Sequence, residues 1–102
     1  MNHGAATYDP QDDYPSFCIA TGEGVVADQS AGVTALAIVI GGSGNGEQIA
    51  ANKVPGVRAA LAWNNDTATL ARAHNDANVI SIGARQHSVD EAIALVEAFI
   101  AE

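Results

Sequence analysis

The sequence predicts an α/β domain: a Rossmann-like parallel sheet with helices on both faces, in three α/β/α layers. Apolar, β-branched runs alternate with segments of helical periodicity, which is the pattern of βαβ crossovers. The first such run, Ala35–Ile40, leads directly into a glycine-rich turn and the start of a helix. In sheets of this kind, ligands are expected beyond the carboxyl ends of the strands. We therefore expect the glycine turn, His74 and Arg85 to lie at or near that edge.

The N-terminal part divides into a polar leader and a helix. Met1–Asp13 shows no periodicity and is interpreted as a flexible leader or loop. Apolar residues recur at helical spacing over Tyr14–Val26, and Pro15 suits a first helical turn. Asp12 or Asp13 is the expected N-cap.

The rest of the chain continues the alternation. Ala35–Ile40 has the length and composition of a strand buried on both faces. Gly22 and Gly24 are expected to weaken the first helix. Asp28–Thr34 is expected to form a connecting loop. The other expected elements are a helix from Gly46 to about Lys53, a strand over Arg58–Trp63, a helix capped within Asn64–Asp66 and ending near Asn75, a strand over Asn78–Ile82, and a C-terminal helix that opens with the capping box of Ser88 and Glu91.

Length and charge restrict the possible functions. A chain of 102 residues is expected to form one domain, residues 1–102. A net charge of −8 with only four basic side chains argues against nucleic acid and anionic membranes as partners. Cys18 is the only cysteine, which fits a reducing cytoplasm. No apolar stretch reaches the roughly 18 residues of a membrane span, and no secretory signal is evident.

The glycine turn is the strongest candidate for a site. Four glycines lie within the six residues of Gly41–Gly46, between a strand and a helix start, where backbone N–H groups can face an anion. The simpler alternative is a tight turn that only permits close packing. Glu47 stands where a dinucleotide fingerprint has its third glycine, and no Lys-Ser/Thr pair of a P-loop follows the turn. A nucleotide-binding half-domain is therefore disfavoured, whereas a carboxylate here suits a general base.

Three segments resemble one family. The segments are GGSGNGEQIAANKVPGVRAALAW, the downstream ARAHNDANVISIGAR and the upstream DDYPSFCIA. They are similar to type B ribose-5-phosphate isomerases, in particular their actinobacterial branch. This family is shared with galactose-6-phosphate isomerase subunits, and the resemblance covers roughly Tyr8–Phe99. It implies an aldose–ketose isomerase of the pentose phosphate pathway that interconverts ribose 5-phosphate and ribulose 5-phosphate through an enediolate. It also implies a cytoplasmic homodimer with shared active sites, and neither cofactor nor metal.

The resemblance assigns roles to individual residues. One branch uses a cysteine at the position of Gly41, whereas the branch resembled here uses the glutamate that aligns with Glu47 as the base. Ser43 and the turn amides would stabilise the enediolate, and His74, from a partner subunit, would assist ring opening. The expected substrate-binding residues are Tyr14, Gly42, Gly44, Asn45, Gly46, Asn75 and Arg85, the last on the phosphate.

Each assignment has a structural alternative that the residues alone leave open. Glu47 can be a solvated carboxylate at a helix N-terminus, and His74 can simply complement a helix C-terminus. Ser43 can be a local turn residue. Arg85 can be a surface residue, and Tyr14 a core residue.

The sequence also departs from the family pattern. The family's N-terminal strand–helix–strand segment, with its substrate-binding Asp-His pair, has no counterpart here, so the chain is expected to be truncated at both ends. The C-terminal extension with two further phosphate-binding arginines is missing too. By the family's topology, the strand over Ala35–Ile40 would then be an unpaired apolar edge. The alternative function is therefore a catalytically impaired remnant that binds phosphosugar weakly or acts as an interaction module.

Overall fold

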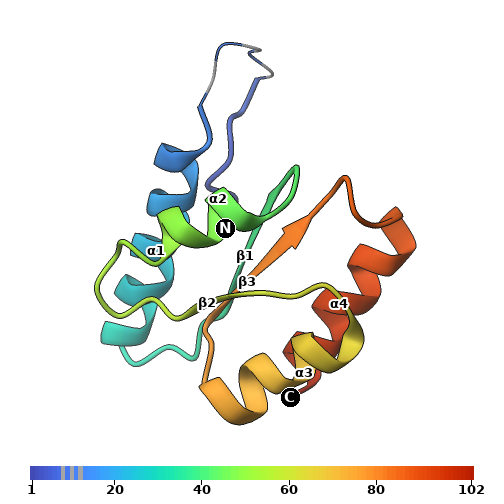
Figure 1. Ribbon diagram of the computed structural model, residues 1–102. Helices are drawn as coiled ribbons and strands as arrows, with labels where there is room; N and C mark the ends of the chain where they lie inside the picture. The colour runs from blue at the N-terminus through green and yellow to red at the C-terminus, as the bar shows by residue number, and fades with distance from the viewer. Residues whose placement is uncertain (8, 10, 12) are drawn as a thin grey trace.

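A parallel three-stranded sheet lies between two pairs of helices in the computed structural model, which describes residues 1–7, 9, 11 and 13–102 (Figure 1). The strand order is β1-β3-β2, and both strand pairs are parallel. This arrangement confirms the predicted α/β fold. In chain order, the elements of the described residues are α1 (Pro15–Ser30), β1 (Ala37–Gly41), α2 (Asn45–Ala51), β2 (Ala59–Leu61), α3 (Asn65–Asn75), β3 (Val79–Gly83) and α4 (Val89–Ala101).

The sheet separates two hydrophobic clusters. One joins α1 and α2 to the sheet and includes Cys18, Val39 and Val79. The other joins α3 and α4 to the opposite face and includes Ile80 and Phe99. Successive strand residues point to opposite faces, which is why Val79 and Ile80 fall into different clusters. None of the helices in the described residues is long and apolar enough to cross a membrane.

The strand buried on both faces is β3, not β1. All five residues of β3 are buried because this strand is central and has helices on either side. β1 lies at the edge, and its Ile38 and Ile40 are 40% and 59% exposed. The prediction that Ala35–Ile40 is buried on both faces is therefore wrong. Within the residues that the structure describes, the expectation of an unpaired apolar edge at this strand is confirmed.

The start of α1 differs from the prediction in its cap. Pro15 is the first helical residue, as expected, but the N-cap is Tyr14, which makes no side-chain capping bond. The Asp13 carboxylate instead accepts a hydrogen bond from the Tyr14 N–H at 2.9 Å, so Asp13 is not the cap. Asp12, the other predicted cap, lies outside the described residues.

The helix also continues further than expected, through the first part of the predicted loop, and ends at Ser30. Its two glycines lie where side chains from other segments come close to the helix backbone. A Cβ at Gly22 would lie 3.0 Å from a methyl group of Val57, and one at Gly24 would lie 2.6 Å from the ring of His3. Packing at these positions outweighs the low helix propensity of glycine.

Side-chain caps begin the two helices on the other face. Asn64 accepts a hydrogen bond from the N–H of Thr67 at the start of α3. Ser88 and Glu91 form the predicted capping box of α4, with the Glu91 carboxylate accepting from the Ser88 N–H at 2.8 Å. Both predicted helix starts are confirmed.

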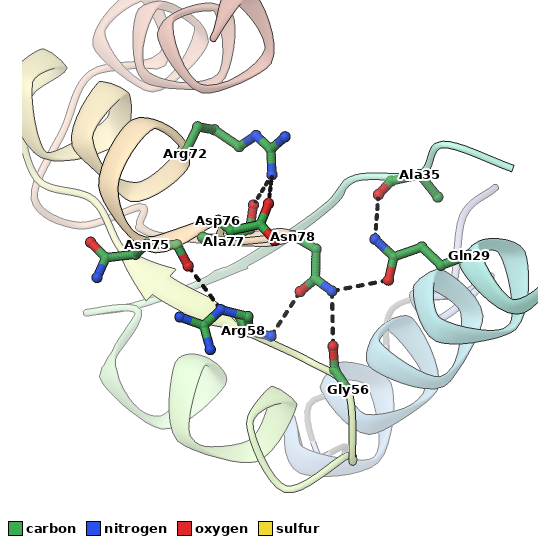
Figure 2. A network of polar contacts seen from close by, with 9 residues as sticks. All are labelled: Gln29, Ala35, Gly56, Arg58, Arg72, Asn75, Asp76, Ala77 and Asn78. Atoms are coloured by element: carbon green, nitrogen blue, oxygen red, sulfur yellow. Dashed lines mark hydrogen bonds and ion pairs between the residues drawn. The ribbon is translucent and has the colours of Figure 1, made fainter. Parts of the chain in front are cut away.

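A polar network ties the elements together at the amino end of the sheet (Figure 2). The buried Asn78 side chain accepts from the Arg58 N–H at 2.8 Å and donates to Gln29 and to the Gly56 carbonyl. The Arg58 guanidinium donates to the Asn75 carbonyl at 2.8 Å. This network fixes the end of α1, the start of β2 and the end of α3 around the entry to β3.

Candidate active site

The glycine turn lies at the carboxyl end of the sheet, between Gly41 at the end of β1 and Asn45 at the start of α2. Gly44 is the N-cap of α2 and has a left-handed backbone with φ of 83°. A Cβ there would lie 2.7 Å from Leu61 and about as close to the backbone of β3. The Ser81 hydroxyl, fully buried on β3, donates to the Gly44 carbonyl at 2.7 Å. The turn is thus anchored on the central strand.

Glu47 is buried beside this turn. It lies in the first turn of α2 and is only 6% exposed. Its carboxyl group occupies the space that a Cβ at Gly41 would fill. The solvated-carboxylate alternative for Glu47 is therefore wrong. The carboxylate is held at the end of β1, in the volume that a side chain at Gly41 would need.

Two further predicted residues pack on glycines of the same turn. The Tyr14 hydroxyl lies where a Cβ at Gly46 would stand, and the ring is 45% exposed, so Tyr14 is not a core residue. The guanidinium carbon of Arg85 lies 3.4 Å from a Cβ built at Gly42. The Arg85 N–H also donates to the Gly42 carbonyl at 3.0 Å. A hydroxyl from α1, a carboxylate from α2 and a guanidinium from the segment after β3 thus surround one loop.

Ser43 has a local partner. Its hydroxyl accepts a hydrogen bond from the Asn45 N–H at 3.2 Å, which is the bond of a local turn residue. Its exposed hydroxyl proton stays available to a ligand. In the part of the chain that the structure describes, the N–H groups of Gly42, Ser43 and Gly44 have no acceptor. These amides can face a developing negative charge.

His74 and Asn75 lie away from this group, and the expectation that His74 is at the same edge is wrong. α3 starts after the carboxyl end of β2 and runs back along the sheet. Its last residue is Asn75, whose carbonyl accepts from Arg58 at the amino end. Both residues are exposed there. One chain therefore brings Tyr14, Glu47 and Arg85 together but not His74 or Asn75.

Cys18 lies near the candidate site, which the sequence did not indicate. The thiol is 5% exposed and packs with Val39 and Ala50. Burial, and secondarily the charge of the Glu47 carboxylate, raise the pKa of this thiol. Cys18 and Glu47 thus lie on two helices, α1 and α2, that pack against each other. No sequence pattern signals this contact, because it depends on how α1 packs against α2.

The charges around the turn suit an anionic, oxygen-rich ligand. Arg85 is exposed beside the turn and is one of only four basic residues in the chain. Within the described ranges, no group of three or more His, Cys, Asp or Glu side chains gathers into a candidate metal site. A carboxylate, an arginine and free amides together can hold a polar ligand while a proton is moved.

Comparison with known proteins identifies similar chains. The family model described as Ribose/Galactose Isomerase matches residues 1–102. The chain is 61% identical over 97 residues to ribose-5-phosphate isomerase B of Mycobacterium tuberculosis and to that of Mycolicibacterium paratuberculosis. Each alignment covers 95% of this chain, but only 57% and 58% of those relatives. The chain thus spans little more than half the length of the curated relatives it matches.

Solved structures show the same fold. The chain superposes on ribose-5-phosphate isomerase B of Mycoplasma genitalium, a structure with bound ribulose 5-phosphate, with a TM-score of 0.85 at 39% identity. That match covers 95% of this chain and 62% of the other. The type B enzyme of Trypanosoma cruzi gives a TM-score of 0.86 at 38% identity, over 95% and 60% of the two chains.

Proposed function

Because this chain belongs to the Ribose/Galactose Isomerase family, we propose that it interconverts ribose 5-phosphate and ribulose 5-phosphate. The observation that carries the proposal is the buried carboxylate of Glu47 beside an open glycine turn. An aldose–ketose isomerisation needs one base that reaches two adjacent carbons. A buried carboxylate at the end of β1, beside the turn, meets that requirement.

The proposed reaction begins with Glu47 removing the proton from C2 of the open-chain aldose. The electron pair moves toward the C1 carbonyl, and the resulting enediolate oxygen faces the amides of the turn and the Ser43 hydroxyl. The hydroxyl proton on O2 passes to O1, and protonated Glu47 returns its proton to C1 as the C2 carbonyl forms, which gives the ketose. Arg85 is assigned to the phosphate, where its planar fork fits the oxygens, and Tyr14 to the sugar. This chemistry uses no cofactor.

His74 and Asn75 belong to the proposal through a second subunit. Within one chain they lie at the opposite end of the sheet from Glu47. A homodimer with shared sites would let the partner's copies reach the glycine turn, His74 for ring opening and Asn75 for binding. The free, buried thiol of Cys18 is compatible with the reducing cytoplasm that we propose as the location.

The direct test follows the formation of ribulose 5-phosphate from ribose 5-phosphate. Glu47→Gln keeps the side-chain shape and removes the base, so we expect kcat to fall by about 10²- to 10⁴-fold. Glu97→Gln removes an exposed carboxylate of α4 and should leave kcat unchanged. Equal activity of Glu47→Gln and the unmodified chain, with both folded by circular dichroism, would overturn the assignment of the base.

Shared sites have their own test. Glu47→Gln and His74→Ala chains, each inactive alone, are unfolded, mixed in equal amounts and refolded together. If each site takes Glu47 from one chain and His74 from the other, half the dimers are mixed and each has one intact site. About a quarter of the unmodified activity should then return. No recovery from a mixture that forms dimers would exclude shared sites.

The second candidate is the catalytically impaired remnant, which binds phosphosugar without turnover. The exposed Arg85 beside the free amides of the turn favours it, because these groups can hold a phosphate without any base. Calorimetry with ribulose 5-phosphate separates the two proposals. Binding that Arg85→Ala weakens, without turnover by the unmodified chain, would support a remnant and exclude an isomerase formed by these residues alone.

A further inference from the structure

The short helix α2, which carries Glu47, takes its position from its contacts with other elements. It has seven residues, and its N-cap, Gly44, makes no side-chain capping bond. Helices of fewer than about 12 residues are marginal in water, so tertiary contacts must hold such a helix in place. The Ser81 hydroxyl ties its first turn to the sheet by donating to the Gly44 carbonyl. The contacts at its other end therefore help to decide where Glu47 lies.

Three side-chain hydrogen bonds tie that other end to one residue of β2. The side-chain carbonyl of Asn52, the C-cap of α2, accepts from the Ala59 N–H at 2.8 Å. The Asn52 NH₂ group donates to the Ala59 carbonyl at 3.0 Å. Gln48 donates to the same carbonyl at 3.2 Å. The Asn52 amide thus pairs with both backbone groups of Ala59, as the backbone of a neighbouring strand would.

These bonds lie on the outer side of β2. The Arg58 carbonyl faces β3, where it accepts from the Asn78 N–H, and backbone groups alternate in direction along a strand. Those of Ala59 therefore point to the side on which no strand of the described residues lies. A cavity of about 500 Å³ on this side is lined by Gln48 and Asn52. Water can replace the bonds of a truncated side chain there, so the chain should still fold without them.

The same bonds set the rotation of α2 about its axis. Gln48 and Asn52 are four residues apart and share one face of the helix. Glu47 is one position before Gln48, about 100° around the axis. Holding the first face against Ala59 therefore directs the Glu47 carboxyl toward Gly41, where it fills the space of a Cβ. Side chains reach about 5–6 Å from a helix axis, so a rotation of about 10° would move the carboxyl by about 1 Å.

We propose that Asn52, assisted by Gln48, is a positioning residue that holds α2 in the rotation at which the Glu47 carboxylate reaches the substrate, which rests on the proposed function of Glu47 as the base. A misplacement of about 1 Å can cost about 100-fold in rate. Asn52 and Gln48 act through Glu47 alone. The binding of the phosphate is assigned to Arg85 and to the turn that Ser81 anchors, so kcat depends on Asn52 whereas KM does not.

The first test measures the position of the carboxyl by NMR, without substrate. In the unmodified chain, the γ protons of Glu47 should show nuclear Overhauser contacts with the α protons of Gly41, because the carboxyl lies against this glycine. Asn52→Ala removes two of the three bonds and should abolish most of the intensity of these contacts. Gln48→Ala removes one bond and should weaken them less. Ser88→Ala is the control, because it removes a side-chain bond at the start of α4 and should leave the contacts unchanged.

The second test follows the formation of ribulose 5-phosphate from ribose 5-phosphate. Asn52→Ala should lower kcat by about ten- to hundred-fold and leave KM nearly unchanged, and Gln48→Ala should lower kcat less. In the Glu47→Gln background, Asn52→Ala should lower kcat no further, because the base that it positions is absent. Ser88→Ala should change neither constant.

The two tests separate this proposal from the proposed function. Unchanged contacts between Glu47 and Gly41 in both Asn52→Ala and Gln48→Ala would overturn the positioning role, whatever the activity. A normal kcat in Asn52→Ala, a rise in KM that matches the fall in kcat, or a further fall in the Glu47→Gln background would overturn it as well. If Asn52→Ala does not fold, Gln48→Ala decides by the same measurements. An unmodified chain without isomerase activity would overturn the proposed function, and the NMR contacts would then decide alone whether Asn52 holds the carboxyl in place.

Discussion

The contact between Gly41 and Glu47 can be tested by one methyl group. In Gly41→Ala, the new methyl falls on the carboxyl group of Glu47. Glu47 is 6% exposed and lies on a helix that packs against β1 and α1, so the carboxyl can move only toward the open turn. Overpacking of this kind costs about 1–3 kcal/mol. For a domain of this size, the melting temperature should fall by about 4 to 24 °C.

A double-mutant cycle assigns this cost to the contact. Glu47→Ala removes the carboxyl and leaves room for the methyl, so Gly41→Ala should cost little in that background. We expect a coupling free energy of about 1–3 kcal/mol from urea unfolding followed by circular dichroism. Gly42→Ala is the control in the same turn, because its methyl would make only ordinary contact with Arg85 at 3.4 Å. It should change stability by less than about 1 kcal/mol.

The reasoning is refuted if the effects of Gly41→Ala and Glu47→Ala are additive. Additivity would mean that the carboxyl does not lie over Gly41 in solution. A loss of stability in Gly42→Ala as large as in Gly41→Ala would refute it too, because the cost would then come from the turn backbone rather than from Glu47.

The remaining predictions concern three other positions. In Ser81→Ala the Gly44 carbonyl loses the Ser81 hydroxyl as a donor but keeps the Gln48 N–H, so the free energy of unfolding should fall by about 0.5–1.5 kcal/mol in urea titrations, whereas an unchanged midpoint would exclude this anchor. The Cys18 thiol should react with Ellman's reagent at pH 8 only as fast as the chain opens, because it is buried and burial raises its pKa; immediate reaction of the folded chain would contradict its placement. Hydrogen bonds from Ser88 lower the pKa of Glu91 below its ordinary value of 4.5, so its stabilising effect is present above that value and is lost as the pH falls through the lowered pKa. Unfolding at pH 7 and pH 3 should therefore differ less in Glu91→Gln than in the unmodified chain, and an equal difference would exclude a contribution from this carboxylate.

Local chemistry made the helix starts on the α3 and α4 face predictable. Asn64 and the pair Ser88 and Glu91 cap helices through bonds that span three residues, so the sequence contains the whole interaction. The start of α1 was predicted less well. Pro15 was placed correctly, but the Asp13 side chain bonds to the next residue instead of reaching into the first turn. The choice between two such local bonds is not visible in the sequence.

Which strand is buried in the centre of the sheet depends on pairing between segments that lie far apart in the sequence. Ala35–Ile40 and the stretch that became β3 are both short apolar runs, and periodicity alone does not distinguish an edge strand from a central one. β3 is central because both other strands pair with it, which depends on crossovers rather than on its own residues. The predicted position of His74 at the carboxyl edge is wrong for a similar reason. The eleven residues of α3 extend about 16 Å, enough to carry its end from the carboxyl edge of the sheet to the amino edge.

The glycines of the turn have a more specific use than the sequence suggested. A run of glycines predicts that a backbone can bend sharply or approach a ligand. Among the glycines of the turn only Gly44 has a left-handed backbone, whereas Gly41 and Gly46 leave room for the Glu47 carboxyl and the Tyr14 hydroxyl. A side chain at either position would displace a residue of the candidate site without any contact to a ligand. Gly41 and Gly46 therefore determine where the carboxylate and the hydroxyl lie, which is why substitution of either glycine should alter chemistry as well as stability.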